Sequence, residues 1–96
     1  LSESKEIVGS EFIVYQNVPN PFSENTNIYF EIANDAEVTL EIYSVNGEKK
    51  MAKTDRFKKG MNQISVNKAN AQLNKGIYYY QIKTQNRSLV RKMIVI

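Results

Sequence analysis

The amino-acid sequence predicts an all-β fold, an immunoglobulin-like antiparallel β-sandwich of about seven strands. Three observations carry this prediction. Apolar and polar residues alternate along several short segments, which is the period of a half-buried strand. Turn signals such as Asn46-Gly47 separate these segments. No window of helical period extends beyond a turn or two.

The start of the chain divides into a polar lead and the first strand. Residues 1–10 are polar and charged and are interpreted as a linker, and residues 11–96 as the folded domain. Phe12-Ile13-Val14-Tyr15 predicts a short strand because β-branched and aromatic residues favour this conformation. Pro19 and Pro21 then exclude helix and regular strand pairing, so the chain is expected to cross to the next strand in an extended form.

Two alternating segments, joined by a turn at Asn34-Asp35, predict the next two strands. Asn46-Gly47 then predicts a tight hairpin, because both positions tolerate positive φ. The hairpin leads into residues 49–56, a charged strand of the kind found at a sheet edge, where lysines discourage aggregation. The residues expected to face the core from the two alternating strands are Ile28, Phe30, Ile32, Val38, Leu40 and Ile42.

The last three strands follow turns at Lys58-Lys59-Gly60, at the irregular residues 67–75 and at residues 85–87. Ile64 and Val66 belong to the first of these strands, and residues 88–96 form the last one. Between them lies a strand that opens at Gly76, in which alternation is expected to bury Tyr78 and Tyr80 and to expose Tyr79.

A tyrosine corner is expected at the start of this strand. The spacing of Leu73, Gly76 and Tyr78 is L-x-x-G-x-Y, in which a tyrosine hydroxyl bonds back to the preceding backbone. This feature is structural and not catalytic.

The composition excludes most enzyme mechanisms. The chain has 96 residues and a mass of 11.1 kDa, which indicates one domain. It has no cysteine and no histidine, so thiol nucleophiles, thiolate metal sites and the commonest general base are absent. Neither a calcium-binding loop nor a glycine-rich phosphate loop is present. We expect no catalytic residues, no metal and no cofactor.

Charge is divided between the two halves of the chain. Residues 1–48 carry nine acidic and one basic residue, and residues 49–96 carry twelve basic and one acidic residue. One interpretation is that acidic strands pair with basic strands in the sheets. The other is a basic face that meets an acidic partner such as phosphate or lipopolysaccharide.

Three arrangements of residues are candidates for functional sites. Glu37 and Glu41 share a strand face, with Glu31 expected across the hairpin, and are interpreted as solubilising charge and not as a catalytic pair. Nucleic-acid binding is not expected, because one exposed aromatic residue does not make a stacking platform. Carbohydrate binding through an exposed Tyr29 or Tyr79 stays open.

No apolar run approaches the length of a transmembrane helix, and the start of the chain does not resemble a signal peptide. The chain begins at Leu1 and not at methionine, as expected for a piece of a longer protein or for a processed chain.

The C-terminal segment is basic and ends in an apolar run. Residues 75–96 carry five basic residues and no acidic one, and they end in Met93-Ile94-Val95-Ile96. Packing as a strand accounts for these residues. An accessible handle for a receptor that reads chain ends or adds a strand is the alternative.

Taken together, four motifs resemble the C-terminal sorting domain of the type IX (Por) secretion system of Bacteroidetes. They occur in the family's order and cover nearly all of residues 12–96. Val18 departs from the tyrosine that is usual in the first motif. The matching segments are Gln16-Asn17-Val18-Pro19-Asn20-Pro21-Phe22 with Thr26-Asn27-Ile28, Leu40 to Gly47, Leu73 to Tyr80, and Arg91-Lys92-Met93-Ile94-Val95.

The resemblance implies a secretion signal. Such domains follow varied cargo proteins that reach the periplasm by a signal peptide, and the outer-membrane translocon recognises the folded sandwich. A sortase-like peptidase then typically cuts before the domain, which places the cut in or before residues 1–10. The cargo ends at the cell surface or outside the cell. An immunoglobulin-like module that binds carbohydrate or an adhesin, or acts as a spacer, is the alternative.

Docking is expected through the terminal strand and its neighbour, and the free edge of a sheet offers a route to an edge-strand dimer. For Gly76 and Tyr78 a purely architectural role is the alternative. The residues assigned to recognition are Gly76, Tyr78, Lys92, Met93, Ile94, Val95 and Ile96. The motif residues assigned to shaping the fold are Pro19, Asn20, Pro21, Phe22, Asn46, Gly47 and Leu73.

Overall fold

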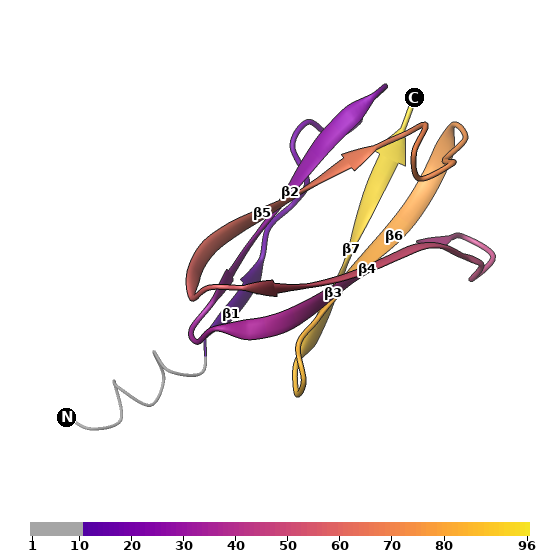
Figure 1. The fold of residues 1–96 in the computed structure, drawn as a ribbon. Helices are drawn as coiled ribbons and strands as arrows, with labels where there is room; N and C mark the ends of the chain where they lie inside the picture. The colour runs from indigo at the N-terminus through magenta and orange to yellow at the C-terminus, as the bar shows by residue number, and fades with distance from the viewer. Residues whose placement is uncertain (1–10) are drawn as a thin grey trace.

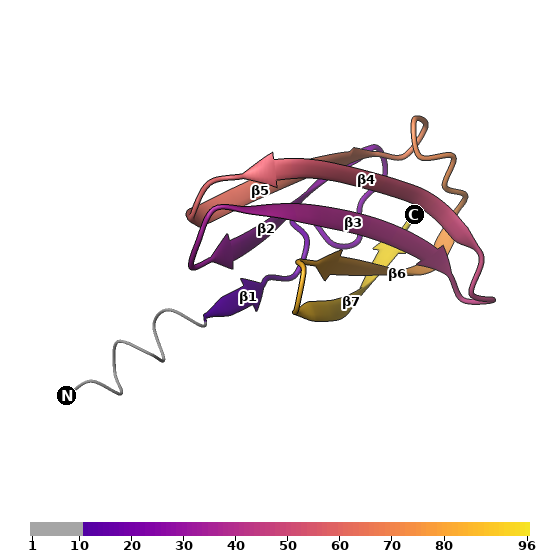
Figure 2. The ribbon, with the colours of Figure 1, turned by 60° about the horizontal axis from the view of Figure 1, so that its bottom comes forward.

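The computed structural model describes residues 11–96, and its regular elements are seven strands. They form a three-stranded sheet in the order β1-β2-β5 and a four-stranded sheet in the order β4-β3-β6-β7 (Figure 2). Each pair of neighbouring strands is antiparallel. The strands are β1 (Phe12–Val14), β2 (Asn25–Ile32), β3 (Ala36–Ser44), β4 (Lys49–Phe57), β5 (Gly60–Asn67), β6 (Gly76–Lys83) and β7 (Ser88–Val95).

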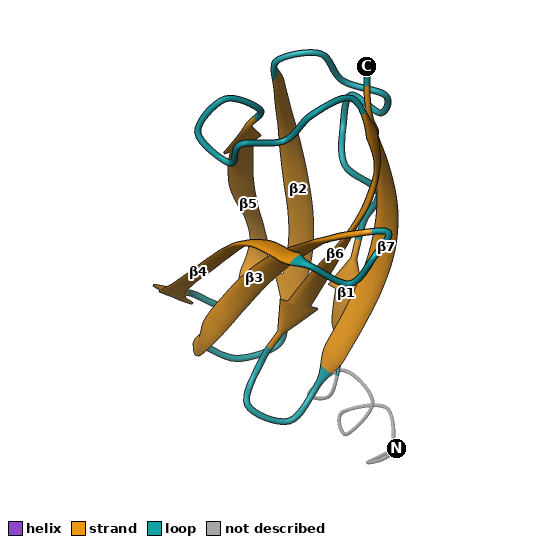
Figure 3. Ribbon diagram, turned by 90° about the vertical axis from the view of Figure 1, so that its right-hand side faces the viewer, coloured by secondary structure: helices purple, strands orange, loops and turns teal. Residues whose placement is uncertain are grey.

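The predicted fold class, an immunoglobulin-like antiparallel β-sandwich of seven strands, is confirmed. Figure 3 shows strands joined by loops along the whole described part of the chain. Within residues 11–96 no helix has the length and apolarity needed to cross a bilayer. The interpretation of residues 1–10 as a linker and cleavage region lies outside the described residues.

The core lies between the two sheets and follows from the alternation of apolar residues. Inward-facing residues of both sheets are buried, and Tyr80 is the largest fully buried side chain. Phe30 and Phe57 from opposite sheets make an edge-to-face contact with ring centroids 5.0 Å apart. The residues expected in the core from β2 and β3 are all buried: Ile28, Phe30, Ile32, Val38, Leu40 and Ile42.

The β3–β4 hairpin and the charged edge strand form as expected. Gly47 has a φ of +88°, which L side chains rarely adopt, and this explains the glycine of the Asn46-Gly47 turn. β4 lies at the edge of the four-stranded sheet and exposes Lys53 and Arg56. The lysine-rich strand therefore occupies a position where pairing with another chain is disfavoured.

The expectation that Glu31 neighbours Glu37 and Glu41 across a hairpin is wrong. Glu31 lies on β2 and the other two lie on β3, and these strands belong to different sheets. The short link between them carries the chain from one layer to the other, so β2 pairs with β1 and β5 instead. A two-sheet fold requires such crossings, and turn residues alone do not distinguish them from hairpins.

The two ends of the sandwich carry different parts of the chain. β1 and the turn between β6 and β7 lie at one end, where the guanidinium carbon of Arg87 is 5.7 Å from the centre of the Phe12 ring. The C-terminus lies at the other end (Figure 1). The segment that enters the domain and the C-terminus are thus separated by the length of the strands.

Candidate recognition face around the C-terminal strand

The proline segment, residues 19–22, pairs with the otherwise free edge of the C-terminal half of β7. The amide of Phe22 donates to the carbonyl of Ile94 (3.0 Å), and the amide of Ile96 donates to the carbonyl of Phe22 (2.9 Å). The amide of Ile94 donates to Oδ1 of Asn20 (2.9 Å). Phe22 also forms a parallel bridge with Val95. Residues 20–22 therefore satisfy backbone groups that an edge strand otherwise leaves unpaired.

Two long side chains extend this closure along β7. Gln16 donates from Nε2 to the carbonyl of Lys92 (2.7 Å), and Arg91 donates from Nε to the carbonyl of Val14 (2.7 Å). Neither contact is visible in a local sequence pattern, because each joins residues more than 70 positions apart. These two hydrogen bonds join the N-terminal segment of the domain to its last strand.

A buried polar network holds the proline segment in shape. The side chains of Asn17 and Thr26 are each 1% exposed. Asn17 Nδ2 donates to the Pro19 carbonyl (3.1 Å) and to Thr26 Oγ1 (3.0 Å), and Thr26 Oγ1 donates to the same carbonyl (2.8 Å). The peptide bonds before Pro19 and Pro21 are cis. Asn17 and Thr26 belong to the first sorting-domain motif, and because both are buried, their hydrogen bonds to one another and to Pro19 satisfy polar groups that water cannot reach.

The tyrosine corner is present. The hydroxyl of Tyr78 donates to the carbonyl of Asn74 and accepts from its amide, both at 2.9 Å. Leu73 and Tyr78 are buried, and Gly76 has a φ of +152°, a conformation that L side chains rarely adopt. These observations support the architectural interpretation of Gly76 and Tyr78.

Replacing Tyr78 by phenylalanine is expected to lower the free energy of unfolding by about 1–2 kcal/mol, since two backbone groups of Asn74 lose their partner. Urea denaturation followed by fluorescence measures the change. Tyr79→Phe is the matched control, because Tyr79 is 40% exposed, and it is expected to change stability by less than about 0.5 kcal/mol. Equal effects of the two substitutions would contradict the corner.

The C-terminal residues differ in what they show to solvent. Met93 and Val95 are buried at 0% and 1% exposure, whereas Lys92 is exposed and Ile94 is half-buried. Ile96 is 58% exposed. Met93 and Val95 are therefore not accessible in the folded domain, and their burial supports the interpretation of packing as a strand. Strand alternation turns these two side chains into the core.

The outer face of the four-stranded sheet surrounds Lys92 with apolar and aromatic residues. Tyr79 stands opposite Lys92 on β7 and opposite Tyr43 on β3. Ile77 stands opposite Ile94 in the neighbouring row. Tyr79 is exposed while Tyr78 and Tyr80 are buried, as expected from alternation. Residues directly opposite one another on antiparallel strands share a face, so this row of β3, β6 and β7 forms one surface.

Glu41 is the acidic centre of the same face. It is only 6% exposed, although it was expected as a solvated charge. Its carboxylate lies 3.3 Å from Nζ of both Lys49 and Lys83 and accepts a 2.7 Å hydrogen bond from the hydroxyl of Tyr43. The hydrogen bond from Tyr43, aided by the two lysines, lowers the pKa of Glu41. The pairing of acidic with basic strands is realised here.

Glu41→Gln is expected to lower the free energy of unfolding at neutral pH. It is also expected to make that free energy less sensitive to acid. The folded-state pKa of Glu41 lies below the ordinary value of a glutamate side chain, so the stabilisation is present above that ordinary value and is lost as the pH falls through the folded-state pKa. The wild type should therefore lose more stability than Glu41→Gln between about pH 5 and pH 3. Thermal unfolding at each pH measures this, with Glu37→Gln on the same face as control. If the melting temperatures of wild type and Glu41→Gln fell in parallel as the pH is lowered, this role of the Glu41 carboxylate would be contradicted.

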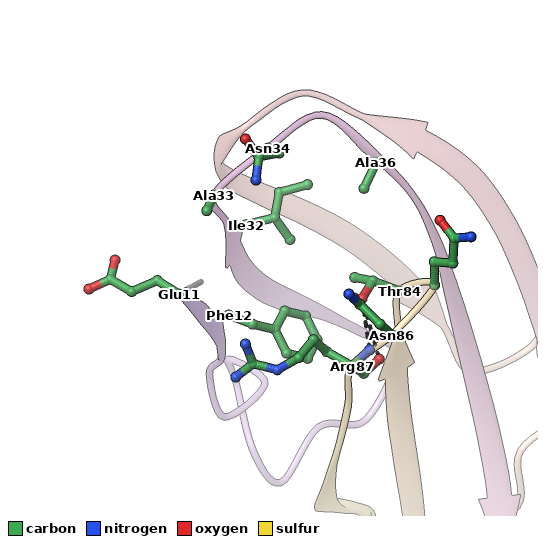
Figure 4. Close-up of a pocket in the computed structure, with 10 residues that line it drawn as sticks. Glu11, Phe12, Ile32, Ala33, Asn34, Ala36, Thr84, Asn86 and Arg87 are labelled. Carbon is green, nitrogen blue, oxygen red and sulfur yellow. Dashed lines mark hydrogen bonds between the residues drawn. The ribbon is translucent and has the colours of Figure 1, made fainter. Parts of the chain in front are cut away.

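A pocket of about 300 Å³ lies at the other end of the sandwich (Figure 4). Of the described residues that line it, Glu11 and Arg87 are ionisable, and Arg87 lies against the ring of Phe12. Among residues 11–96 no group of three or more acidic side chains gathers to hold a metal ion.

Comparison with known proteins adds a family and a fold. The family described as "Secretion system C-terminal sorting domain" matches residues 16–96. No curated protein sequence matches the chain. The crystal structure of dimeric latent PorU from Porphyromonas gingivalis is similar at a TM-score of 0.68 and 19% identity, covering 91% of this chain and 10% of that one.

Two β-glucosidase structures share the fold at lower similarity. The enzyme from Listeria innocua in complex with isofagomine has a TM-score of 0.54 and 12% identity, covering 88% of this chain and 16% of that one. The enzyme from Kluyveromyces marxianus has a TM-score of 0.56 and 12% identity, covering 91% and 14%. The chain thus spans a small part of each of these proteins, and at these identities the likeness shows the fold alone.

Proposed function

Since the chain belongs to the family of type IX secretion system C-terminal sorting domains, we propose that residues 11–96 direct an attached cargo protein across the outer membrane. The type IX translocon reads the folded sandwich, and a sortase-like peptidase then cuts within or before residues 1–10. The cargo passes through the periplasm and ends at the cell surface or outside the cell. The domain itself acts by binding and not by catalysis.

One observation carries the proposal beyond the family match. Motifs from the start and the end of the domain meet at the C-terminal strand, where Asn20 and Phe22 hydrogen-bond to the backbone of Ile94 and Ile96. A linear peptide signal does not need such closure. The contacts support a signal that is presented by a folded domain, with its terminal strand fixed in one place.

The position of the entering chain supports the same function. β1, where the described part of the chain begins, and the C-terminus lie at opposite ends of the sandwich (Figure 1). A cargo that precedes β1 is thereby attached at the end away from Ile96. The C-terminal end of the sandwich stays accessible while a bulky protein is attached.

A fusion protein tests the proposal. A signal peptide and a fluorescent protein are placed before residues 1–96 in a bacterium that possesses the type IX system, and surface and medium fluorescence are measured. We expect export of the fusion, retention of the fluorescent protein without residues 1–96, and loss of export in a strain without the translocon. Mass spectrometry of the released cargo is expected to show a new C-terminus within or before residues 1–10.

A folded fusion that stays in the periplasm of the competent strain would contradict the proposal. The domain would then be tested as a carbohydrate- or adhesin-binding module. Export without a cut would leave the sorting function standing and would overturn the assignment of the peptidase step alone.

A further inference from the structure

The two sheets of the sandwich differ in charge. The three strands of the smaller sheet contain no lysine or arginine. The four strands of the larger sheet contain seven: Lys49, Lys50, Lys53, Arg56, Lys83, Arg91 and Lys92. Only three acidic residues accompany them in those strands: Glu37, Glu41 and Asp55. The lysines and arginines that lie in strands therefore all belong to one of the two layers of the fold (Figure 2).

Four of these basic residues share the outer face of the larger sheet. Each of their partners in the register is next in sequence to a buried core residue, so by alternation they face away from the core: Lys49 opposite Tyr43, Arg56 opposite Glu37, Lys83 opposite Thr39, and Lys92 opposite Tyr79. Glu41 is shared between Lys49 and Lys83 and offsets part of their charge. Glu37, opposite Arg56, lies on this face too, so four basic residues outnumber two acidic ones there, and no acidic residue stands in register with Lys92.

Exposed apolar side chains lie within this positive face. Ile77 is 42%, Tyr79 40% and Val90 56% exposed. The register places Ile77 beside Ile94, and Val90 beside Gln81 on β6. Contact with an apolar or aromatic surface stabilises such groups, and tyrosine is enriched where proteins meet. A bare phosphate group would engage the lysines and leave these side chains unused.

The edge of β7 is closed to a partner at its C-terminal half. Phe22, Asn20 and Gln16 already occupy the outward backbone groups of Lys92, Ile94 and Ile96. Addition of a strand at this edge requires the proline segment to leave. The face of the sheet remains the accessible part of the terminal strand.

On the basis of the proposed function, we propose that the outer face of β3, β6 and β7, centred on Tyr79 and Lys92, binds an acidic polypeptide segment of the secretion machinery. Carboxylates of that segment pair with Lys92 and its basic neighbours, and its apolar side chains cover Tyr79, Ile77 and Val90. Charge complementarity of this kind fixes the partner and speeds the encounter.

Charge reversal at Lys92 tests the face in the fusion described above. Lys92→Glu is expected to reduce export at least about tenfold, because like charges then oppose one another across the interface. Tyr79→Ala should reduce it as well, and Lys92→Gln less than Lys92→Glu. Lys53→Glu is the matched control: Lys53 is exposed on the same sheet, but it stands opposite the buried Leu40, on the inner side. It should leave export within about twofold of wild type.

Stability is measured for each purified variant, so that a folding defect is separated from a binding defect. Variants of the face are expected to keep their melting temperature within about 3 °C of wild type, as for exposed positions. If wild type is exported and both Lys92→Glu and Tyr79→Ala are exported equally well, this face is not the binding surface. The sorting function itself would still stand. Failure of the wild-type fusion would overturn the sorting function first.

A photo-crosslinking residue at position 79 identifies the occupant in living cells. Mass spectrometry of the crosslinked peptide is expected to show a segment of the secretion machinery with an excess of Asp and Glu. A crosslink to lipopolysaccharide, or to a segment without an acidic excess, would overturn the acidic polypeptide as the occupant.

Discussion

Deleting residues 93–96 is expected to unfold the domain. Met93 and Val95 are fully buried, and burial of two such side chains contributes about 3–6 kcal/mol. The deletion also removes the backbone groups of Ile94 and Ile96 that bind Phe22. A domain of this size is stable by only about 5–15 kcal/mol in total, so most of its stability is lost.

Circular dichroism and limited proteolysis of the purified deletion variant measure this effect. Ile96→Ser is the control, because Ile96 is 58% exposed and its amide is kept. A deletion variant that stays folded would contradict the placement of the terminal strand in the core. If it unfolds, loss of secretion on deletion reports the fold and not recognition, and point variants of exposed residues are needed instead.

Phe22→Ala is expected to lower the free energy of unfolding by about 3–5 kcal/mol, the range for truncating a buried phenylalanine. Phe22 is 1% exposed and bridges Val95, so the substitution acts on the contact between the proline segment and the terminal strand. Chemical denaturation measures the loss. Val18→Ala, at a position that is 57% exposed, should cost less than about 0.5 kcal/mol.

A double-mutant cycle with Val95→Ala tests whether the two segments stabilise one another. The combined loss is expected to be smaller than the sum of the single losses, because neighbours in contact are not independent. Strict additivity of the two losses would show that Phe22 and Val95 stabilise the domain separately. It would contradict the coupling between the proline segment and β7.

The strands of the fold were predictable because alternation and turn chemistry are local. Ile28, Phe30 and Ile32 faced the core as expected, and Gly47 adopted the positive φ that its turn requires. The sheet to which each strand belongs was not predictable in the same way. Glu31 and Glu37 are close in the sequence, yet they lie in different layers because sheet membership depends on packing between distant segments.

The candidate site was predictable in part. Tyr78 formed its corner, since the spacing of that motif is local. The roles of Asn20 and Gln16 depend on contacts to residues 74 and 76 positions away, which no pattern in the sequence displays. Alternation alone would have shown that Met93 and Val95 point into the core. The same alternation buries Tyr78 and Tyr80 on the neighbouring strand.

The central claim is that this folded sandwich is a sorting signal for the type IX translocon. The most direct measurement is the ratio of surface and medium fluorescence to periplasmic fluorescence for the residue 1–96 fusion, in strains with and without the translocon. We expect a high ratio only where the translocon is present. An equal ratio in both strains, with the domain shown to be folded, would contradict it.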